Sequence, residues 1–172
     1  FSDEAYYDYI TDPDYPSMTE LVKEGKNIIV SKTFSKVYGL AGIRIGYLIA
    51  RPDIAVRLKD NIMAMTNVLA IAAATEALKD DEFYKFSVTK NAKAKDIIYE
   101  TLNSLKLPYI KSHTNFEFFK SGRHIKELSS QMRNEGIAIG RPFPPLYDWC
   151  RISTGTTEEV EAFCSALKIV YS

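Results

Sequence analysis

The most informative stretch of the sequence lies at residues 33–46, which read TFSKVYGLAGIRIG. A short apolar run with β-branched residues precedes it at 27–31 and predicts a buried strand. The glycines at 39 and 42 indicate a loop, and the run at 43–50 predicts a second strand. The stretch therefore places Lys36 on a loop between two strands. It also places Arg44 inside an apolar strand, where a guanidinium needs a buried or bound anion.

The pattern around this stretch predicts a mixed α/β chain. A strand that ends near Asp3 comes first, and Pro52 suits the first position of a helix. Residues 68–78 are apolar nearly all round and predict a buried helix, and residues 82–105 fit one face of a long helix capped by Asp80 or Asp81. Beyond it we expect strands at 116–119, 137–139 and 149–153, a short helix closed by Gly136, and a last helix opened by the capping box Thr156-x-x-Glu159. The chain is expected to divide near residue 80, into 1–80, the edge of a large α/β domain, and 81–172, a smaller α+β unit.

Composition excludes several classes of protein. Lys plus Arg and Asp plus Glu both number 22, so the net charge is zero, whereas a nucleic-acid binder needs a basic surplus. No apolar run is long enough to cross a bilayer. Cys150 and Cys164 lack metal-ligand spacing and have apolar neighbours, which indicates reduced core thiols and no metal site. We therefore expect a cytoplasmic protein without a nucleic-acid or membrane partner.

Three features stand in a fixed order along the chain: Asp3-x-x-Tyr6, then Ser35-Lys36 with an arginine eight residues later, then Arg151 in a late apolar run. This set resembles the fold-type I pyridoxal-phosphate (PLP)-dependent aminotransferases, most closely their histidinol-phosphate aminotransferase-like branch. The resemblance covers nearly the whole chain and includes the segment GRPFPP at 140–145. It implies the C-terminal part of a PLP-dependent transferase fold, with the upstream half absent, and we expect the sequence to be a fragment.

The resemblance assigns a role to each cofactor residue. Lys36 would be the amine that holds the PLP aldehyde, and it would then move a proton as general base and acid. Asp3 would pair with the pyridine nitrogen, and Tyr6 would lie beside the phenolic oxygen. Arg44 would bind the phosphate with a forked, permanently charged guanidinium. Hydroxyl donors on the same side would come from Thr33 and Ser35.

The resemblance also assigns the substrate contacts. Arg151 would bind the anionic group of the substrate, an α-carboxylate or a phosphate, and so orient its Cα–H bond. Arg141 is a weaker second candidate for the same task. His113 and His124 have no metal-ligand neighbours and are interpreted as ordinary loop or surface histidines.

The favoured function is transfer of an amino group between an amino acid, or a histidinol phosphate-like amine, and a 2-oxo acid, by an enzyme that is a homodimer in its full-length form. A PLP-dependent decarboxylase of the same family is an alternative, because one fold supports several reactions. A second alternative is a catalytically silent module, whose mark would be exposed apolar surface at 68–78. We expect the 172-residue chain alone not to turn over amino donors.

Overall fold

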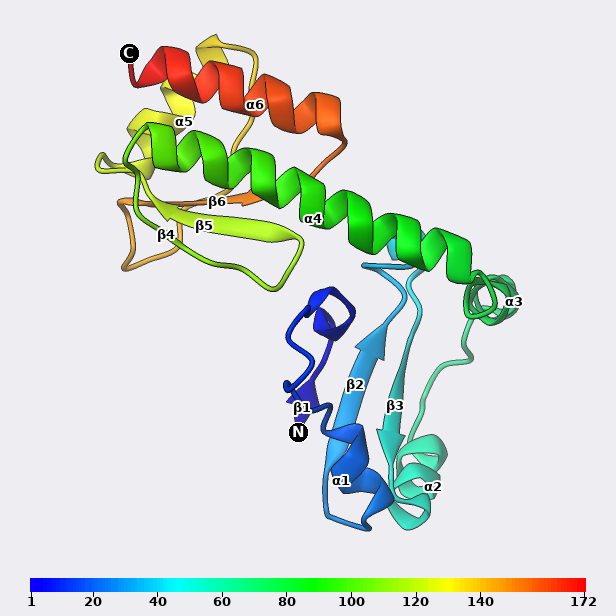
Figure 1. Ribbon diagram of the computed structural model, residues 1–172. Helices are drawn as coiled ribbons and strands as arrows, with labels where there is room; N and C mark the ends of the chain where they lie inside the picture. Colours follow the sequence, from blue (N-terminus) through cyan, green and yellow to red (C-terminus); the bar gives the residue numbers. More distant parts are fainter. The chain divides into compact units, whose positions relative to one another are not determined.

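The computed structural model describes residues 1–172, and the chain divides into two compact units, Phe1–Val88 and Thr89–Ser172 (Figure 1). The long helix α4 (Asp81–Ser104) contributes its first residues to unit 1 and the rest to unit 2. The expected division between residues 80 and 81 falls at the N-terminus of this helix. None of the helices combines the length and the apolar character needed to span a membrane.

Unit 1 is built on a three-stranded sheet in the order β1-β2-β3. β1 (Ser2–Asp3) pairs parallel with β2 (Ile29–Thr33), which pairs antiparallel with β3 (Gly46–Ala50). The strand predicted to end near Asp3 is therefore confirmed. The helical elements of this unit, besides the start of α4, are η1 (Tyr7–Tyr9), α1 (Thr19–Lys23), η2 (Ala41–Ile43), α2 (Pro52–Asp60) and α3 (Val68–Ala77).

The prediction of a strand over 43–50 is wrong in its first residues. Ala41–Ile43 form the 3-10 helix η2, and Arg44 has a φ of 55°, in the left-handed region, so the chain cannot be extended there. β3 begins only at Gly46, where the backbone approaches β2 closely. A Cβ atom at this position would lie 2.7 Å from the carbonyl oxygen of Lys32, so only glycine fits.

The prediction that the helix at 68–78 is buried is also wrong. The helix forms as α3, but only Ala70 and Ala74 are buried in it. Leu69 is 78% exposed and Val68 is 71% exposed. The packing of α3 within this chain uses only the narrow face with the two alanines, and its large side chains lie on the other faces.

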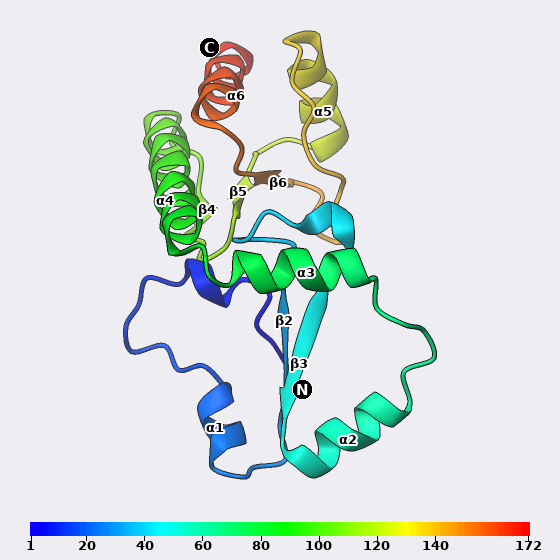
Figure 2. The ribbon, with the colours of Figure 1, turned by 90° about the vertical axis from the view of Figure 1, so that its right-hand side faces the viewer.

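Unit 2 packs helices on one side of a second sheet. β4 (Tyr109–Ile110), β5 (Phe116–Lys120) and β6 (Trp149–Ser153) form an antiparallel sheet in that order. Figures 1 and 2 show α4, α5 (Ile125–Asn134) and α6 (Thr157–Val170) on the same side of this sheet. The side chains buried between them come from alternate strand positions and from the inner helix faces, and they include Ile98, Leu102, Phe119, Leu128, Met132, Ile152 and Leu167, together with the free thiols Cys150 and Cys164.

The predicted helix caps are present. The Asp80 carboxylate accepts a hydrogen bond from the Phe83 amide at 2.9 Å, and Gly136 ends α5 with a φ of 78°. Thr156 and Glu159 form the reciprocal capping box of α6. The caps at the N-termini of α4 and α6 satisfy amide groups that the first turn of a helix leaves without partners, and each stabilises its helix by about 1 kcal/mol.

The strand predicted at 137–139 does not form. The amide of Ile137 donates to the Met132 carbonyl at 2.9 Å, as part of the bonds that close α5. This bond ties the start of the segment to the helix end, and the segment makes no strand ladder with β6. Gly140 still lies close to β6, since a Cβ atom there would overlap the carbonyl oxygen of Arg151.

Candidate active site

Asp3 ends β1 and lies directly beside Ser31 of β2 in the parallel ladder. The pairing places both side chains on the same face of the sheet, and the Ser31 hydroxyl donates to Asp3 Oδ1 at 3.0 Å. The Ala5 amide donates to the same oxygen at 3.1 Å. Two donors therefore hold one carboxylate oxygen, and the exposed group is fixed in orientation without being paired to a cation.

Glu4, the residue after β1, and Lys32 of β2 point to the opposite face and form a separate network. Glu4 is buried, and its carboxylate lies 3.0 Å from Lys32 Nζ. It also accepts hydrogen bonds from the Ser17 hydroxyl and the Met18 amide. Burial raises the pKa of Glu4, but these hydrogen bonds and the Lys32 charge outweigh it and hold the pKa below its ordinary value. The Lys32 amine is thus engaged in an ion pair on the face opposite Asp3.

Lys36 is the other lysine of this region, and its surroundings differ. It is half-buried on the loop after β2, between the buried anchors Phe34 and Val37. Its Nζ lies 5.0 Å from the ring centroid of Tyr6, over the face of the ring. No carboxylate lies within ion-pair distance of this amine. The fold therefore brings Tyr6, from the turn after β1, to Lys36, from the loop after β2.

Thr33 and Ser35 shape the same loop through a local bond. The Thr33 hydroxyl accepts from the Ser35 amide at 3.1 Å, which bends the chain as it leaves β2. The Phe34 amide donates to the Ile45 carbonyl at 3.3 Å. This bond holds Ile45, the residue after Arg44, beside Phe34, so the segment that carries Arg44 lies next to the loop that carries Lys36.

Arg44 itself is exposed, which corrects the expectation that it sits within an apolar strand. Its Nη1 donates to the Ala41 carbonyl at 2.8 Å, and no carboxylate pairs with it. The left-handed backbone at Arg44 is uncommon for a residue other than glycine and costs about 1 kcal/mol.

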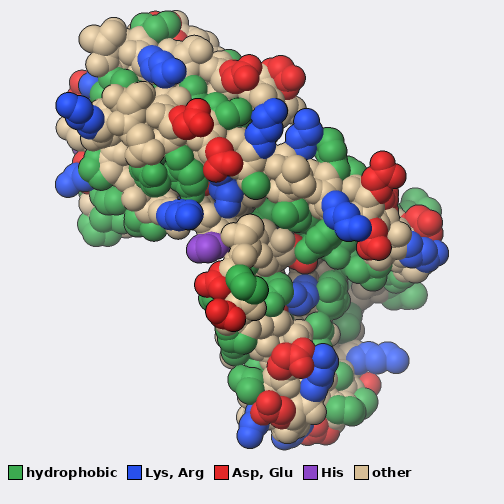
Figure 3. Space-filling view, viewed as in Figure 1, with side chains coloured by type: hydrophobic (Ala, Val, Ile, Leu, Met, Phe, Trp, Pro, Cys, Tyr) green, Lys and Arg blue, Asp and Glu red, His purple; other side chains and the backbone are tan.

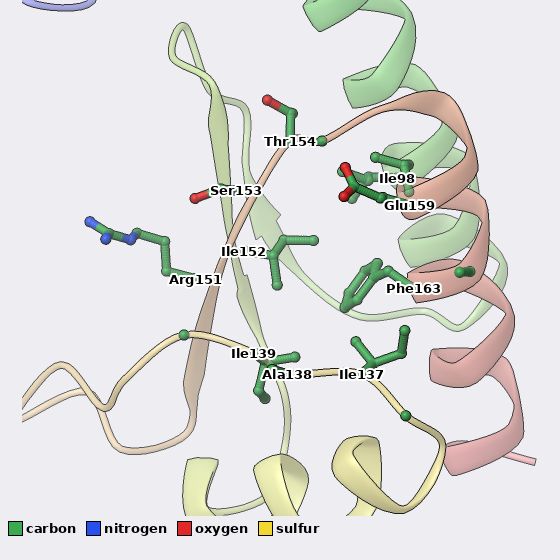
Figure 4. A pocket seen from close by; sticks show the side chains of 15 residues that line it. Ile98, Ile137, Ala138, Ile139, Arg151, Ile152, Ser153, Thr154, Glu159 and Phe163 are labelled. Atoms are coloured by element: carbon green, nitrogen blue, oxygen red, sulfur yellow. The ribbon is translucent and has the colours of Figure 1, made fainter. Parts of the chain in front are cut away.

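Arg151 lies in unit 2, on β6 directly opposite Phe118 of β5. Its guanidinium is half-buried between two rings, 5.0 Å from the Phe116 centroid and 4.7 Å from the Phe143 centroid. No carboxylate pairs with it. Figure 4 shows Arg151 on one side of β6 and Ile152 on the other, where Ile152 faces the helices. Arg141 is exposed and also lies over Phe143, at 4.5 Å.

The structure also shows features that the sequence did not reveal. A cavity of about 390 Å³ lies on the strand face of unit 2 that carries Arg151, and its walls include Phe116, Phe118 and Phe143. A second cavity, of about 610 Å³, lies between β6, the 137–140 segment and α6, and most of its lining is apolar (Figure 4). The period-2 spacing of Phe116 and Phe118 was the one signal for the first cavity, because it puts both rings on one face.

Glu117 is a further residue that the sequence did not single out. Its side chain is fully buried on the helix side of β5, and neither carboxylate oxygen has a hydrogen-bond partner of ordinary geometry. Burial raises the pKa of Glu117 to about 7, although the nearby Tyr99 hydroxyl and the Lys95 charge lower it in part. The Lys95 amine donates to the Ser112 carbonyl at 2.9 Å, and burial lowers its pKa.

Comparison with known proteins gives one consistent result. The family model for aminotransferase class I and II matches residues 1–167. Histidinol-phosphate aminotransferases from Moorella thermoacetica and Caldicellulosiruptor saccharolyticus are each 38% identical to this chain, over 96% and 98% of it, and the matches cover 44% and 48% of those proteins. The crystal structure of histidinol-phosphate aminotransferase from Sinorhizobium meliloti, in complex with pyridoxal-5'-phosphate, matches 98% of this chain with a TM-score of 0.86 and 31% identity, and the match covers 47% of that chain. The chain thus spans about half the length of these relatives.

Proposed function

The chain belongs to the class I and II aminotransferases, and from this membership we propose that Lys36 binds PLP and that the chain serves in amino-group transfer to a 2-oxo acid. The amino donor would be an amino acid or a histidinol phosphate-like amine. The enzyme of full length would be a homodimer. PLP, when bound, supplies an electron sink that stabilises negative charge on the substrate's α carbon.

The observation that carries this proposal is the contrast between the two lysines around β2. Lys32 Nζ is ion-paired with buried Glu4, whereas Lys36 Nζ has no anionic partner and lies over the Tyr6 ring. An amine that must react with an aldehyde cannot be held in an ion pair, because the pair stabilises the protonated form. Lys36 is the lysine that meets this condition, and it lies over the ring of Tyr6.

The chemistry of the candidate residues suits the charges of PLP. Asp3 presents an oriented, unpaired carboxylate, which can hold a proton on a pyridine nitrogen. Arg44 keeps N–H donors beyond the one used by Ala41, and these suit a phosphate group, with the hydroxyls of Thr33 and Ser35 as further donors. The Lys36 amine can accept a proton from the substrate's α carbon and return it to a neighbouring atom. Arg151 and Arg141 are the candidates for the substrate's anionic group.

Borohydride trapping tests the proposal directly. The chain is incubated with PLP, reduced, digested and mapped by mass spectrometry. We expect a phosphopyridoxyl group on Lys36 and none on Lys32. The variant Lys36→Ala should lose the label, whereas Lys26→Ala, an exposed lysine outside this site, should keep it. A label that maps to Lys32, or that survives in Lys36→Ala, would contradict the assignment.

The exposed apolar face of α3 favours a second candidate, a catalytically silent module that associates through this face. The same labelling experiment separates the two. A chain that self-associates and shows no label on any lysine supports the module, and a label on Lys36 supports the cofactor site.

A further inference from the structure

Two short segments of unit 1 bring Tyr6 and Lys36 together. Tyr6 directly precedes η1, and Lys36 lies on the loop after β2. The paired positions of β1 and β2 end at Asp3 and Ser31, before either residue is reached. The sheet alone therefore does not fix the approach of the Lys36 amine to within 5.0 Å of the Tyr6 ring centroid. Contacts outside the sheet have to do so.

Tyr84, near the start of α4, contacts both segments. Its hydroxyl donates to Asp8 Oδ1 at 3.2 Å, and Asp8 lies in η1, two residues after Tyr6. Its ring approaches the ring of Tyr38, with centroids 5.8 Å apart, and Tyr38 lies two residues after Lys36. One side chain thus joins the segment that carries Tyr6 to the segment that carries Lys36.

Both contacts of Tyr84 are built to persist. The side chains of Tyr84 and Asp8 are partly buried, and Asp8 forms no ion pair that would compete for its carboxylate. Burial, followed by the Asp8 charge, raises the pKa of Tyr84, so the hydroxyl keeps its proton and remains the donor. Tyr38 is held in turn by buried Phe34, with ring centroids 5.1 Å apart.

The residue before Tyr84 adds a second contact to the lysine loop. A Cβ atom at Gly39 would lie 3.4 Å from Cζ of Phe83, so the Phe83 ring lies against the loop. The Asp80 carboxylate, which accepts from the Phe83 amide, fixes this first turn of α4. The start of α4 therefore supports the loop that carries Lys36 through two neighbouring rings.

We propose that Tyr84 is a positioning residue, which holds the Tyr6 ring over the Lys36 amine. It acts through its bond to Asp8 and its contact with Tyr38. Its importance for the reaction rests on the proposed function, in which Lys36 is the reactive amine. A reacting group that is displaced slightly loses much of its rate, so a residue that fixes this approach affects the chemistry without taking part in it.

Nuclear magnetic resonance without cofactor can measure the position of Lys36. Protons over the face of an aromatic ring resonate upfield, so the Lys36 ε-methylene protons should lie upfield of those of exposed Lys26. Tyr6→Leu, which removes the ring, identifies the part of the shift that Tyr6 causes. A loss of stability does not alter this shift in molecules that remain folded, so the measurement separates positioning from stability.

Tyr84→Phe removes the hydroxyl and keeps the ring. We expect it to reduce the upfield shift of Lys36 by up to about half, because loss of a hydrogen bond changes a conformational equilibrium roughly two- to tenfold. Asp8→Ala should reduce the shift to a similar extent. Asp8→Asn, which keeps an acceptor oxygen, should retain most of it.

Tyr99→Phe is the matched control. Tyr99 lies on the same helix, but its hydroxyl accepts a hydrogen bond from the Ser112 amide at 2.8 Å, within unit 2. The change removes a comparable bond and should lower the thermal stability, yet it should leave the Lys36 shift unchanged. Circular dichroism of each variant checks that it is folded.

Four results would overturn the proposal. They are an unchanged chain without an upfield shift at Lys36, an undiminished shift in Tyr84→Phe, equal losses in Asp8→Asn and Asp8→Ala, and an equal loss in Tyr99→Phe.

Labelling with PLP and borohydride keeps this proposal apart from the proposed function. Where the unchanged chain is labelled at Lys36, Tyr84→Phe should be labelled roughly two- to tenfold more slowly. If Lys36 takes no label but its shift responds to Tyr84→Phe, the cofactor assignment fails and the positioning of Lys36 by Tyr84 stands. If Lys36 is labelled and its shift ignores Tyr84→Phe, the positioning role alone fails.

Discussion

Arg44 is a residue on which stability and binding make opposite demands. Its φ of 55° strains an arginine backbone but suits glycine. We expect Arg44→Gly to raise the free energy of unfolding by up to about 1 kcal/mol. The same change should weaken PLP binding roughly tenfold or more, because the phosphate loses a charged donor. Thermal denaturation without PLP and titration with PLP measure the two effects.

Lys106 supplies the control for this prediction. It has the same φ of 55°, in the turn that follows α4, far along the chain from the lysine loop. Lys106→Gly should stabilise the chain to a similar extent and leave PLP affinity unchanged. If both variants lose PLP affinity equally, or if Arg44→Gly binds PLP normally, Arg44 is not a phosphate ligand.

Glu117 should make the stability of unit 2 depend on pH. Its pKa is raised from 4.5 to about 7 in the folded chain, chiefly by burial. Between these values the unfolded chain has released the proton that the folded chain still holds, so the contribution of Glu117 to stability is largest below about pH 4.5 and is lost as the pH rises to about 7. The loss from this group is about 1.4 kcal/mol per pH unit at most, or roughly 3 kcal/mol in total. Lys95 and Tyr99 face the carboxyl from α4.

Glu117→Gln removes this titration while it keeps the shape of the side chain. We expect its free energy of unfolding, measured in urea at pH 5, 6, 7 and 8, to exceed that of the unchanged chain by an amount that grows up to about pH 7 and then levels off. The exposed Glu100 of α4 offers a control, and Glu100→Gln should follow the unchanged chain at every pH. Parallel profiles for Glu117→Gln and the unchanged chain would show that the buried carboxyl does not titrate in this range.

At the scale of the element, periodicity and caps predicted helices well, but they did not predict what covers each helix. α5 and α6 bury residues at helical spacing on one face, among them Leu128, Met132, Val160 and Leu167. α3 is apolar on all sides, so its sequence holds no information on which face packs. The same limit applies at 137–139. The apolar run there suits a strand, but the Ile137 amide donates to the Met132 carbonyl at the end of α5.

The exposed face of α3 should drive association between chains. Val68, Leu69 and Ile71 present large apolar side chains to solvent, and burial of one such side chain is worth about 1.5–3 kcal/mol. We expect sedimentation velocity to show concentration-dependent association of the unchanged chain, weakened roughly tenfold or more in Leu69→Glu. Glu76→Gln, on the same helix, should associate like the unchanged chain, and equal behaviour of all three would remove α3 from the interface.

At the scale of the whole molecule, the mixed α/β fold and the family were predictable from the sequence, because a few fixed residue types stand at fixed distances from Lys36. The fold also brought Tyr6 to Lys36, as the order of the motifs implied. The left-handed turn at Arg44 escaped prediction because nothing in the residue type favours it. The ion pair of Lys32 and the aromatic cavity around Arg151 escaped because they depend on contacts between segments far apart in the sequence. Local patterns carry no record of such contacts.

The surface charge of the molecule is mixed in sign. The 22 basic and 22 acidic side chains balance, and Figure 3 shows both signs interspersed over the visible face. No single-signed field of the kind that attracts nucleic acid is evident on that face. Recognition should therefore depend on individual guanidinium groups, such as those of Arg44 and Arg151, that lack an internal partner.

The position of the two thiols has a practical consequence. Cys150 and Cys164 both lie in the core of unit 2, and unit 1 has no cysteine. A thiol reagent added to the native protein can therefore reach sulfur only while Thr89–Ser172 opens, and burial also raises the pKa of Cys150 to about 12. The rate of thiol modification therefore reports the opening of Thr89–Ser172 and does not respond to opening of Phe1–Val88 alone.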